Sequence, residues 1–476
     1  MSKRTKLFIE NFLVYGLGQA ISKIIPFLML PIITRLIPDT YYYGINDVLN
    51  VVVSFGSALV IMGLYDALFR MFFDKDELEY KKEVCSSALF SILISGGIVF
   101  LILSIFINFF EQLFFDTQQY PILIFIVAVD IYIKALKTII AAPTRMENKR
   151  RTYLIINVIS PIIGYSLSIP LLLKGYYLLA LPLSSMLSSI ITLIIFYSIN
   201  RTWFQFKFIN REIIYALLKI GLPLVPTFIF YWIFSSFDRI MISKLIGIEQ
   251  VGIYSIGAKV ASISQLVYTA FSGGWSYFTF STMKDEDHVE LISKVYEYLG
   301  IIAFSSTILL MPFSKIIFEL LFTGEYIKGY IVFPYLFLSP LILMLFQTAG
   351  SQFLVIKKSW PISASLLLGV MVNIILNYIL IPRFGIVGAS VATLLGYICS
   401  ASILTLVLIK MKLLKIKSRF LVPISGISIY FVFFNILRLN SDFIFRFISS
   451  LLVIAVYILL YLQDFKNISR IKEYRY

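Results

Sequence analysis

The chain has 476 residues, 59% of them hydrophobic and 14% charged, and carries a formal net charge of +15. This composition excludes a soluble globular protein, because the longest polar intervals, around residues 70–84, 199–212 and 410–419, are too short to form a domain. The basic charges lie beside apolar stretches, where they meet anionic lipid head groups, so nucleic-acid binding is not expected. Two cysteines and one histidine give no disulfide framework, no metal site and no histidine-based catalysis, and the histidine, His288, is expected to be a solvated residue of the short loop KDEDH.

About fourteen apolar stretches follow one another, and each is long enough to cross a hydrocarbon core of about 30 Å at about 1.5 Å per residue. Lys and Arg gather on alternate connections between these stretches, and the other connections hold few. Since cytoplasmic connections carry the excess of basic residues, both chain ends are predicted to lie in the cytoplasm. The sequence predicts an all-α polytopic membrane protein, with spans at residues 8–34, 44–69, 85–110, 119–143, 153–173, 176–198, 213–240, 251–279, 295–321, 330–356, 359–381, 386–409, 420–438 and 443–464.

The two halves of the chain resemble each other with a period of about 208 residues. Six spans return the chain to the side on which it started, so the halves are parallel repeats related by an axis along the membrane normal. We predict one six-helix lobe at residues 1–205, a second at 206–410 and an additional helix pair at 411–476. Three pairs of segments carry the repeat: RLIPDTYYYGI from Arg35 with KLIGIEQVGIY from Lys244, Lys149–Arg150 with Lys357–Lys358, and Ile169–Pro170 and Gly175 with Ile381–Pro382 and Gly385.

Internal prolines occur in the first span of each half, Pro26 and Pro31 in span 1 and Pro223 and Pro226 in span 7. Each proline removes a backbone hydrogen bond and bends or breaks its helix. Their equivalent positions indicate matched bending elements, although membrane helices also tolerate proline without such a role.

Polar side chains recur at helical spacing in the first two spans of each half, so that each of these spans has one polar face. We expect the four faces to turn toward a shared lumen. The residues are Asn11, Tyr15, Gln19 and Lys23 in span 1, Asn46, Asn50, Ser54 and Ser57 in span 2, Thr227, Tyr231, Ser235 and Asp238 in span 7, and Ser255, Lys259, Ser262 and Thr269 in span 8.

Two lysines lie deep in this predicted lumen, where a charge costs at least about 2.5–3.5 kcal/mol and marks a cavity or a paired site. Lys23 and Lys259 have no acid three or four positions away, so they predict a positive interior suited to phosphate or pyrophosphate. The alternatives are that they snorkel to the surface or pair with Asp47, Asp66 or Asp238 from other spans. The predicted substrate-binding residues are Lys23, Lys259, Gln19, Tyr15, Asn50, Tyr231, Ser255 and Ser262.

Five further charged residues are candidates for gates. Asp130 and Lys134 lie one helical turn apart in span 4 and are expected to neutralise each other, in a structural or a gating role. Arg35, Asp238 and Arg239 lie near the outer surface, where they are either gates or a solvated rim.

Three segments resemble the signatures of bacterial polysaccharide-repeat-unit flippases, in the multidrug/oligosaccharidyl-lipid/polysaccharide exporter superfamily. They are FLMLPIITRLIPDTYYYGINDV at residues 27–48, FDRIMISKLIGIEQVGIYSIGAKV at 237–260 and NYILIPRFGIVGASVATLLGYI at 377–398, similar to the signatures of spans 1–2, 7–8 and 11–12. The resemblance covers essentially the whole chain. It implies two six-helix lobes and an extra helix pair that shapes a groove for a lipid tail.

The resemblance also implies an activity without catalytic residues. Members move an undecaprenyl-pyrophosphate-linked oligosaccharide from the inner to the outer face of the bacterial cytoplasmic membrane, for O-antigen, capsule or exopolysaccharide synthesis. In the related lipid II flippase, cationic residues of spans 1, 2 and 8 line the cavity. Lys23 and Lys259 occupy corresponding spans, whereas span 2 has Asp47 and no base.

The expected function is therefore a flippase that works by alternating access, with H⁺ or Na⁺ as a coupling ion and no other cofactor. A polymerase and glycosyltransferases of the same pathway are the expected protein partners. The alternatives are a lipid II or teichoic-type precursor flippase, a drug or cation antiporter, and a membrane enzyme such as a sugar polymerase. An antiporter favours acids in the lumen, and such an enzyme needs a larger outer loop than this chain has.

Overall fold

The computed structural model describes residues 23–115, 119–437 and 443–473, and in these ranges it contains helices and no strand. Nine helices of the described residues are long and apolar enough to cross a membrane, or ten when the bent pair α14 and α15 counts as one span. An α-helix satisfies its backbone hydrogen bonds internally, as hydrocarbon requires. The predicted all-α polytopic membrane protein is confirmed, and the number fourteen stays a prediction.

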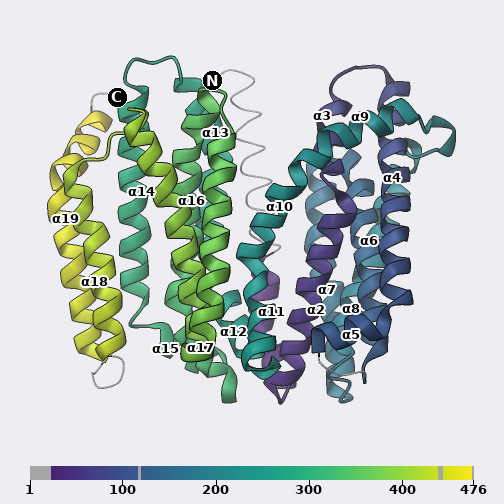
Figure 1. The fold of residues 1–476 in the computed structure, drawn as a ribbon, viewed down its shortest axis with the longest axis horizontal. Coiled ribbons are helices and arrows are strands. Elements are labelled where there is room, and N and C mark those ends of the chain that lie inside the picture. The colour runs from purple at the N-terminus through teal and green to yellow at the C-terminus, as the bar shows by residue number, and fades with distance from the viewer. Residues whose placement is uncertain (1–22, 116–118, 438–442, 474–476) are drawn as a thin grey trace. The chain divides into compact units, whose positions relative to one another are not determined.

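The first of two compact units comprises Met1–Ile256, Phe322–Tyr326 and Asn377–Ile386. Helix α6 lies at its centre, packed against α2, α4 and α8, with α7 against α8 (Figure 1). A helix over residues 23–36 precedes α2 (Thr40–Ile61), α3 (Leu64–Phe72), α4 (Leu78–Ile105), α5 (Ile107–Phe115), α6 (Pro121–Met146), α7 (Arg150–Leu173) and α8 (Ala180–Asn200), which the short η1 (Arg201–Trp203) and η2 (Phe206–Phe208) follow.

The seventh span is helical throughout but irregular, with a 3₁₀ turn at the prolines that predicted a bend. It runs as α9 (Arg211–Gly221), the 3₁₀ turn η3 (Leu222–Leu224), α10 (Val225–Trp232), the π-helical η4 (Ile233–Phe237) and α11 (Asp238–Ile246), before α12 (Ile248–Ala261). In contrast, residues 23–36 are α-helical throughout, Pro26 and Pro31 included. The described part of the first span therefore lacks this irregularity, and its prolines are tolerated within the helix.

The second span is broken, and its break touches the seventh span just before the 3₁₀ turn. Met62 and Gly63 take left-handed conformations, with φ of 47° and 70°, between α2 and α3. A Cβ atom on Gly63 would lie 2.5 Å from the carbonyl oxygen of Gly221, and one on Gly221 would lie 2.6 Å from that of Met62. The two backbones thus approach so closely that no side chain fits between them.

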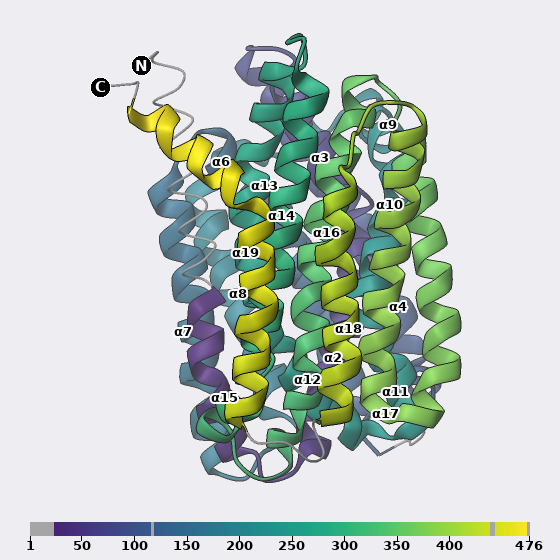
Figure 2. The same cartoon turned by 90° about the vertical axis from the view of Figure 1, so that its left-hand side faces the viewer.

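The second compact unit comprises Gly257–Leu321, Ile327–Leu376 and Val387–Tyr476. Helices α13 and α14 both pack on α16, and α18 and α19 lie beside each other against α14 (Figure 2). The helices from here on are α13 (Ser264–Thr282), α14 (His288–Leu310), α15 (Ser314–Leu321), α16 (Phe333–Val355), α17 (Trp360–Lys410), α18 (Leu421–Leu437) and α19 (Phe443–Glu473), with η5 (Gly324–Ile331) and η6 (Ser418–Phe420) as short 3₁₀ segments.

Helix α17 contains two predicted spans. Its 51 residues would extend for about 77 Å, more than twice the hydrocarbon thickness, if the helix were straight. The break lies at Gly385, whose φ of 59° lies in the left-handed region, as the turn predicted there requires. Asn373 Nδ2 donates to Thr393 Oγ1 over 3.3 Å, so the two arms lie side by side.

Two helix ends that the sequence repeat places near equivalent positions take similar conformations. Asn148 and Lys357 end their helices with φ of 59° and 58°. The next amide, of Lys149 or Lys358, donates to the carbonyl five residues back, over 2.9 Å and 2.8 Å. These hydrogen bonds pair Lys149 with Lys358, whereas the sequence repeat pairs Lys149 with Lys357. The lobe boundaries at 205 and 410 stay a prediction, because the compact units reflect contacts and not the repeat.

We expect Gly221→Ala to lower the thermal unfolding midpoint in detergent, because the added methyl group meets the Met62 carbonyl. Gly97→Ala is the matched control, since a Cβ atom there meets nothing within 4 Å and alanine favours helix. Fluorescence-detected size exclusion after heating measures both variants. Equal midpoints for Gly221→Ala and the wild type would contradict the close contact.

Candidate functional site

Buried charged side chains of the first unit join α2 to the end of the seventh span. Asp47 of α2 and Asp238 of α11 are 4% and 3% exposed. Arg239 connects them, with Nε 2.7 Å from Asp47 Oδ2 and Nη1 3.3 Å from Asp238 Oδ1. The guanidinium group presents several donors in a rigid plane, so one arginine can hold two carboxylates.

Hydroxyl groups of α12 give each carboxylate a second donor. Tyr254 donates its hydroxyl hydrogen to Asp238, and Ser255 donates to Asp47. Arg239 Nη1 also donates to the Ser235 carbonyl over 2.6 Å. Buried charges are tolerated when they are paired and hydrogen-bonded, and these contacts meet both conditions. We call Asp47, Asp238, Arg239, Tyr254 and Ser255 the outer cluster, because the topology predicted from the sequence places them near the outer surface.

The local backbone explains why neighbours in sequence share this cluster. Adjacent residues of an α-helix do not normally face each other. Asp238 is the first residue of α11, directly after the π-helical η4, and its carboxylate accepts from the backbone N–H of Arg239 over 2.8 Å. An acid in the first turn of a helix also interacts favourably with the helix dipole. The carboxylate therefore lies back along the helix start, next to the arginine.

The outer cluster contains three residues that the sequence singled out, Asp238 and Arg239 as gate or rim residues and Ser255 for substrate binding. The solvated-rim alternative is wrong for Asp238, which is buried, and for Arg239, whose side chain is 14% exposed. It fits Arg35, which is exposed. Asp47, one of the acids considered as a lysine partner, holds Arg239 and Ser255.

The other predicted binding residues lie in both units. Lys23 and Asn50 of the first unit are exposed, and Asn50 Nδ2 donates to the Asn46 carbonyl over 2.9 Å. Lys259 of the second unit is half-buried, and the exposed Ser262 donates to its carbonyl over 2.6 Å. A common lumen for these side chains stays a prediction. Tyr231 is half-buried in the first unit, and Tyr15 and Gln19 lie outside the described residues.

A family model described as polysaccharide biosynthesis protein matches residues 8–284, more than half of the chain. The chain belongs to this family. An uncharacterised membrane protein of Methanocaldococcus jannaschii is 28% identical to this chain over 194 residues. The match covers 40% of this chain and spans 38% of the length of that relative.

Solved transporter structures share the fold of this chain. A lipid II flippase, MurJ, in an inward closed conformation has a TM-score of 0.72 at 16% identity, over 95% of this chain and 99% of that one. An inward-facing multidrug resistance transporter of the MATE family and MOP superfamily has a TM-score of 0.65 at 15% identity, over 84% and 94%. A MOP superfamily transporter from Pyrococcus furiosus has a TM-score of 0.60 at 13% identity, over 85% and 95%.

A second ion pair lies in α6, and a serine of α8 contacts both of its residues. Lys134 Nζ is 2.8 Å from Asp130 Oδ2, as the i,i+4 spacing predicted. Ser185 of α8 accepts from Lys134 over 3.1 Å and donates to Asp130 over 3.2 Å, which closes a triangle. Since the triangle joins two tightly packed helices, it favours a structural role, and gating by Asp130 and Lys134 stays a prediction.

Sequence reasoning missed a third polar cluster, in the second unit. Glu297 of α14 is 2% exposed and accepts from Tyr461 of α19 over 3.2 Å and from the Lys417 backbone N–H over 2.9 Å. Arg419 bridges Glu297 and Asp464, at 3.4 Å and 2.5 Å. The cluster anchors the additional helix pair to α14. A single sequence carries no signal for partners more than a hundred residues apart.

The prediction that His288 is solvated is wrong. It ends the polar string KDEDH, yet its side chain is 5% exposed. Its Nδ1 lies 3.0 Å from Thr282 Oγ1 and its Nε2 lies 3.4 Å from Gln352 Nε2. Because His288 begins α14, which packs on α16, helix packing buries it.

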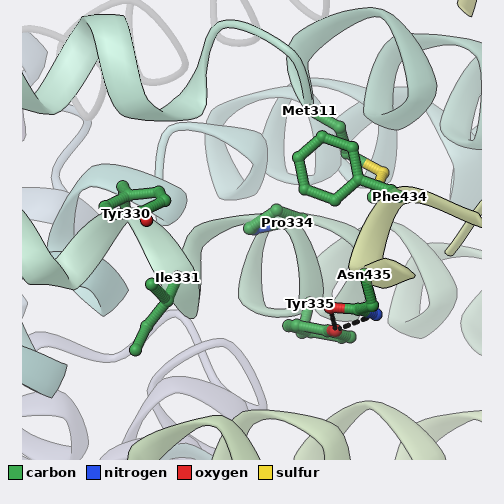
Figure 3. A pocket seen from close by; sticks show the side chains of 7 residues that line it. All are labelled: Met311, Tyr330, Ile331, Pro334, Tyr335, Phe434 and Asn435. Carbon is green, nitrogen blue, oxygen red and sulfur yellow. Dashed lines mark hydrogen bonds between the residues drawn. The ribbon is translucent and has the colours of Figure 1, made fainter. Parts of the chain in front are cut away.

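A small recess opens where α18 meets the start of α16 (Figure 3). The hydrogen-bonded side chains of Tyr335 and Asn435, with Tyr335 Oη 2.9 Å from Asn435 Oδ1, lie on one side of it. Its lining is otherwise mainly apolar, and consists of Met311, Tyr330, Ile331, Pro334, Tyr335, Phe434 and Asn435.

We expect Arg239→Gln to lower the free energy of unfolding by about 3–5 kcal/mol, because it leaves two buried carboxylates without their cation. Thermal unfolding in detergent measures the loss as a lower midpoint. Lys315→Gln is the control, since Lys315 pairs with Glu319 at the surface and such pairs contribute about 0–1 kcal/mol.

Adding Asp47→Asn to Arg239→Gln should recover part of that stability, since one uncompensated charge is removed. The two changes are then non-additive, as for residues in one charged network. Strict additivity of their effects on unfolding would contradict the ion pair.

Proposed function

We propose that this protein is a flippase that carries a polyprenyl-pyrophosphate-linked oligosaccharide across the bacterial cytoplasmic membrane, for O-antigen, capsule or exopolysaccharide synthesis. The main support within the polysaccharide biosynthesis family is that the lipid II flippase fold covers 95% of the chain, against 84% for the multidrug transporter. We take the larger coverage as support for a lipid-linked substrate.

The proposed mechanism places the head group in a wet cavity while the polyprenyl tail stays in lipid. Moving sugars and a pyrophosphate through hydrocarbon would forfeit their hydration at a cost of many kcal/mol. Lys23 and Lys259 would offset this cost by binding the pyrophosphate, since ammonium groups bind phosphate as point charges. Alternating access then exposes the site to each side in turn. Tyr15, Gln19, Asn50, Tyr231, Ser255 and Ser262 would contact the sugars.

The outer cluster argues against the antiporter alternative. An antiporter for cationic drugs needs acids that are available in its lumen. Asp47 and Asp238 are buried and hold Arg239, so neither is available for a cationic substrate in this conformation. A lipid II or teichoic-type precursor is the second candidate substrate, because the lipid II flippase shares the fold over nearly the whole chain.

We further propose that both termini lie in the cytoplasm and that an H⁺ or Na⁺ gradient drives transport, beside a polymerase and glycosyltransferases of the pathway. Arg35, Asp238 and Arg239 would act as outer gates, and Asp130 and Lys134 would support their lobe. The protein itself would be a carrier and not an enzyme.

We expect Lys23→Ala and Lys259→Ala each to slow export at least about tenfold without a change in protein level, because a hydrogen bond to a charged group contributes about 1.5–3 kcal/mol. Appearance of the lipid-linked repeat unit on the outer face of proteoliposomes measures the rate, with Lys315→Ala as the surface control. Full activity in both variants would refute the anion site.

Transport into proteoliposomes should accelerate when either a proton or a sodium gradient is imposed, and the other gradient alone should have no effect. An ionophore specific for the active ion should remove the acceleration. If neither gradient changes the rate, coupling to these ions is excluded.

A further inference from the structure

Helices α2 and α12 touch through backbone atoms of the first unit, at one glycine each. A Cβ atom on Gly44 would lie 3.0 Å from the carbonyl carbon of Ile248, and closer still to its oxygen. A Cβ atom on Gly252 would lie 2.9 Å from the carbonyl carbon of Thr40, and again closer to the oxygen. Any side chain larger than hydrogen at either position would hold the two helices apart.

The residues in these contacts are equivalent in the sequence repeat, with the same difference in residue number each time. Adding 208 to Thr40, Gly44 and Asp47 gives Ile248, Gly252 and Ser255, and α2 and α12 begin at Thr40 and Ile248. Gly44 contacts Ile248, which is the repeat equivalent of Thr40. Gly252, the repeat equivalent of Gly44, contacts Thr40 itself. Such an exchange of roles is the mark of a two-fold interface. Two similar segments of one chain therefore meet as the subunits of a symmetric dimer would.

Asp47 and Ser255 are repeat partners that contact each other, so they lie on the local two-fold axis. In a strictly symmetric pair, a residue on the axis meets its own copy, and two carboxylates there would repel. Divergence of the repeats has placed a hydroxyl donor opposite the carboxylate. Arg239 adds an asymmetric contact, because the corresponding stretch of the first span, Leu30–Pro31, carries no charge.

We infer that Thr40–Asp47 and Ile248–Ser255 form a two-fold closure of the transport path, with Gly44 and Gly252 as the equivalent positions on which its closing depends. This inference rests on the proposed function, in which the closure seals the outer side. Asp47 and Ser255 each lie seven residues from their helix starts, about 10 Å deep. Opening breaks the Asp47–Ser255 and Asp47–Arg239 contacts, and closing restores them together with the glycine contacts.

The first test measures access from outside. Asn50→Cys, placed one turn beyond Asp47 in a chain with Cys85→Ala and Cys399→Ala, is labelled in right-side-out vesicles with a membrane-impermeant maleimide. Gly44→Ala and Gly252→Ala should each raise the labelling rate several-fold and by similar factors, because both hold the closure open. Gly97→Ala, with open space around its new methyl group, should leave the rate unchanged. Unchanged labelling in either closure variant overturns the inference.

The second test keeps both glycines, so it does not depend on whether the alanine variants fold. Asp47→Cys and Ser255→Cys are combined in the same background, with a protease site inserted in residues 201–210 to separate the two cysteines after cleavage. Mild oxidation without lipid substrate should join the fragments, and the single substitutions should not. Fragments that stay separate overturn the closure. If they are joined but the wild type moves no lipid-linked saccharide, the closure stands and the proposed function fails.

Discussion

The pairing of Arg239 with Asp47 and Asp238 is the constraint on which the closed arrangement of α2, α11 and α12 depends. A guanidinium group stays protonated at every accessible pH, so this cluster cannot avoid its charge by releasing a proton. Separating the partners without water would leave buried charges uncompensated, at several kcal/mol. In the proposed function, the cluster would therefore be favourable in two states, closed and dry or open and hydrated, as alternating access requires.

The helix breaks of the first unit lie where such a change can be accommodated. Helices are stiff, and domain movements are absorbed by a few residues at element ends. Met62–Gly63 interrupts the span of Asp47, and η3 and η4 interrupt the span of Arg239. Asp47 thus lies on the 22-residue α2, and Asp238 and Arg239 lie on the nine-residue α11. The close contact of Gly63 with Gly221 keeps the two interruptions together.

Sequence patterns predicted the features that depend on local chemistry. Hydropathy gave the helices, glycine gave the turn at Gly385, and i,i+4 spacing gave the Asp130–Lys134 pair. Partners far apart were not predictable, since nothing in one sequence connects Asp47 with an arginine 192 positions later. The prediction that His288 is solvated failed for a related reason. A string of polar residues resembles a loop as long as the helix that packs against it is not known. The internal repeat was visible in the sequence. The contact of α2 with α12 at Gly44 and Gly252 was not.

The pairing of Arg239 also separates the residues proposed to close the transport path from those proposed to bind the head group. Arg239 directs Nε and Nη1 to two carboxylates and to a backbone carbonyl, so its charge is already matched inside the protein. A pyrophosphate would have to displace those carboxylates to use it, which would leave two buried acids beside an anion. In the proposed function, the cations for an anionic head group would therefore come from elsewhere in the chain, and Lys23 and Lys259 lie in the spans where the family resemblance implies them. Substitutions at the outer cluster should then change how often the path opens, whereas substitutions at the lysines should change how tightly the head group is held.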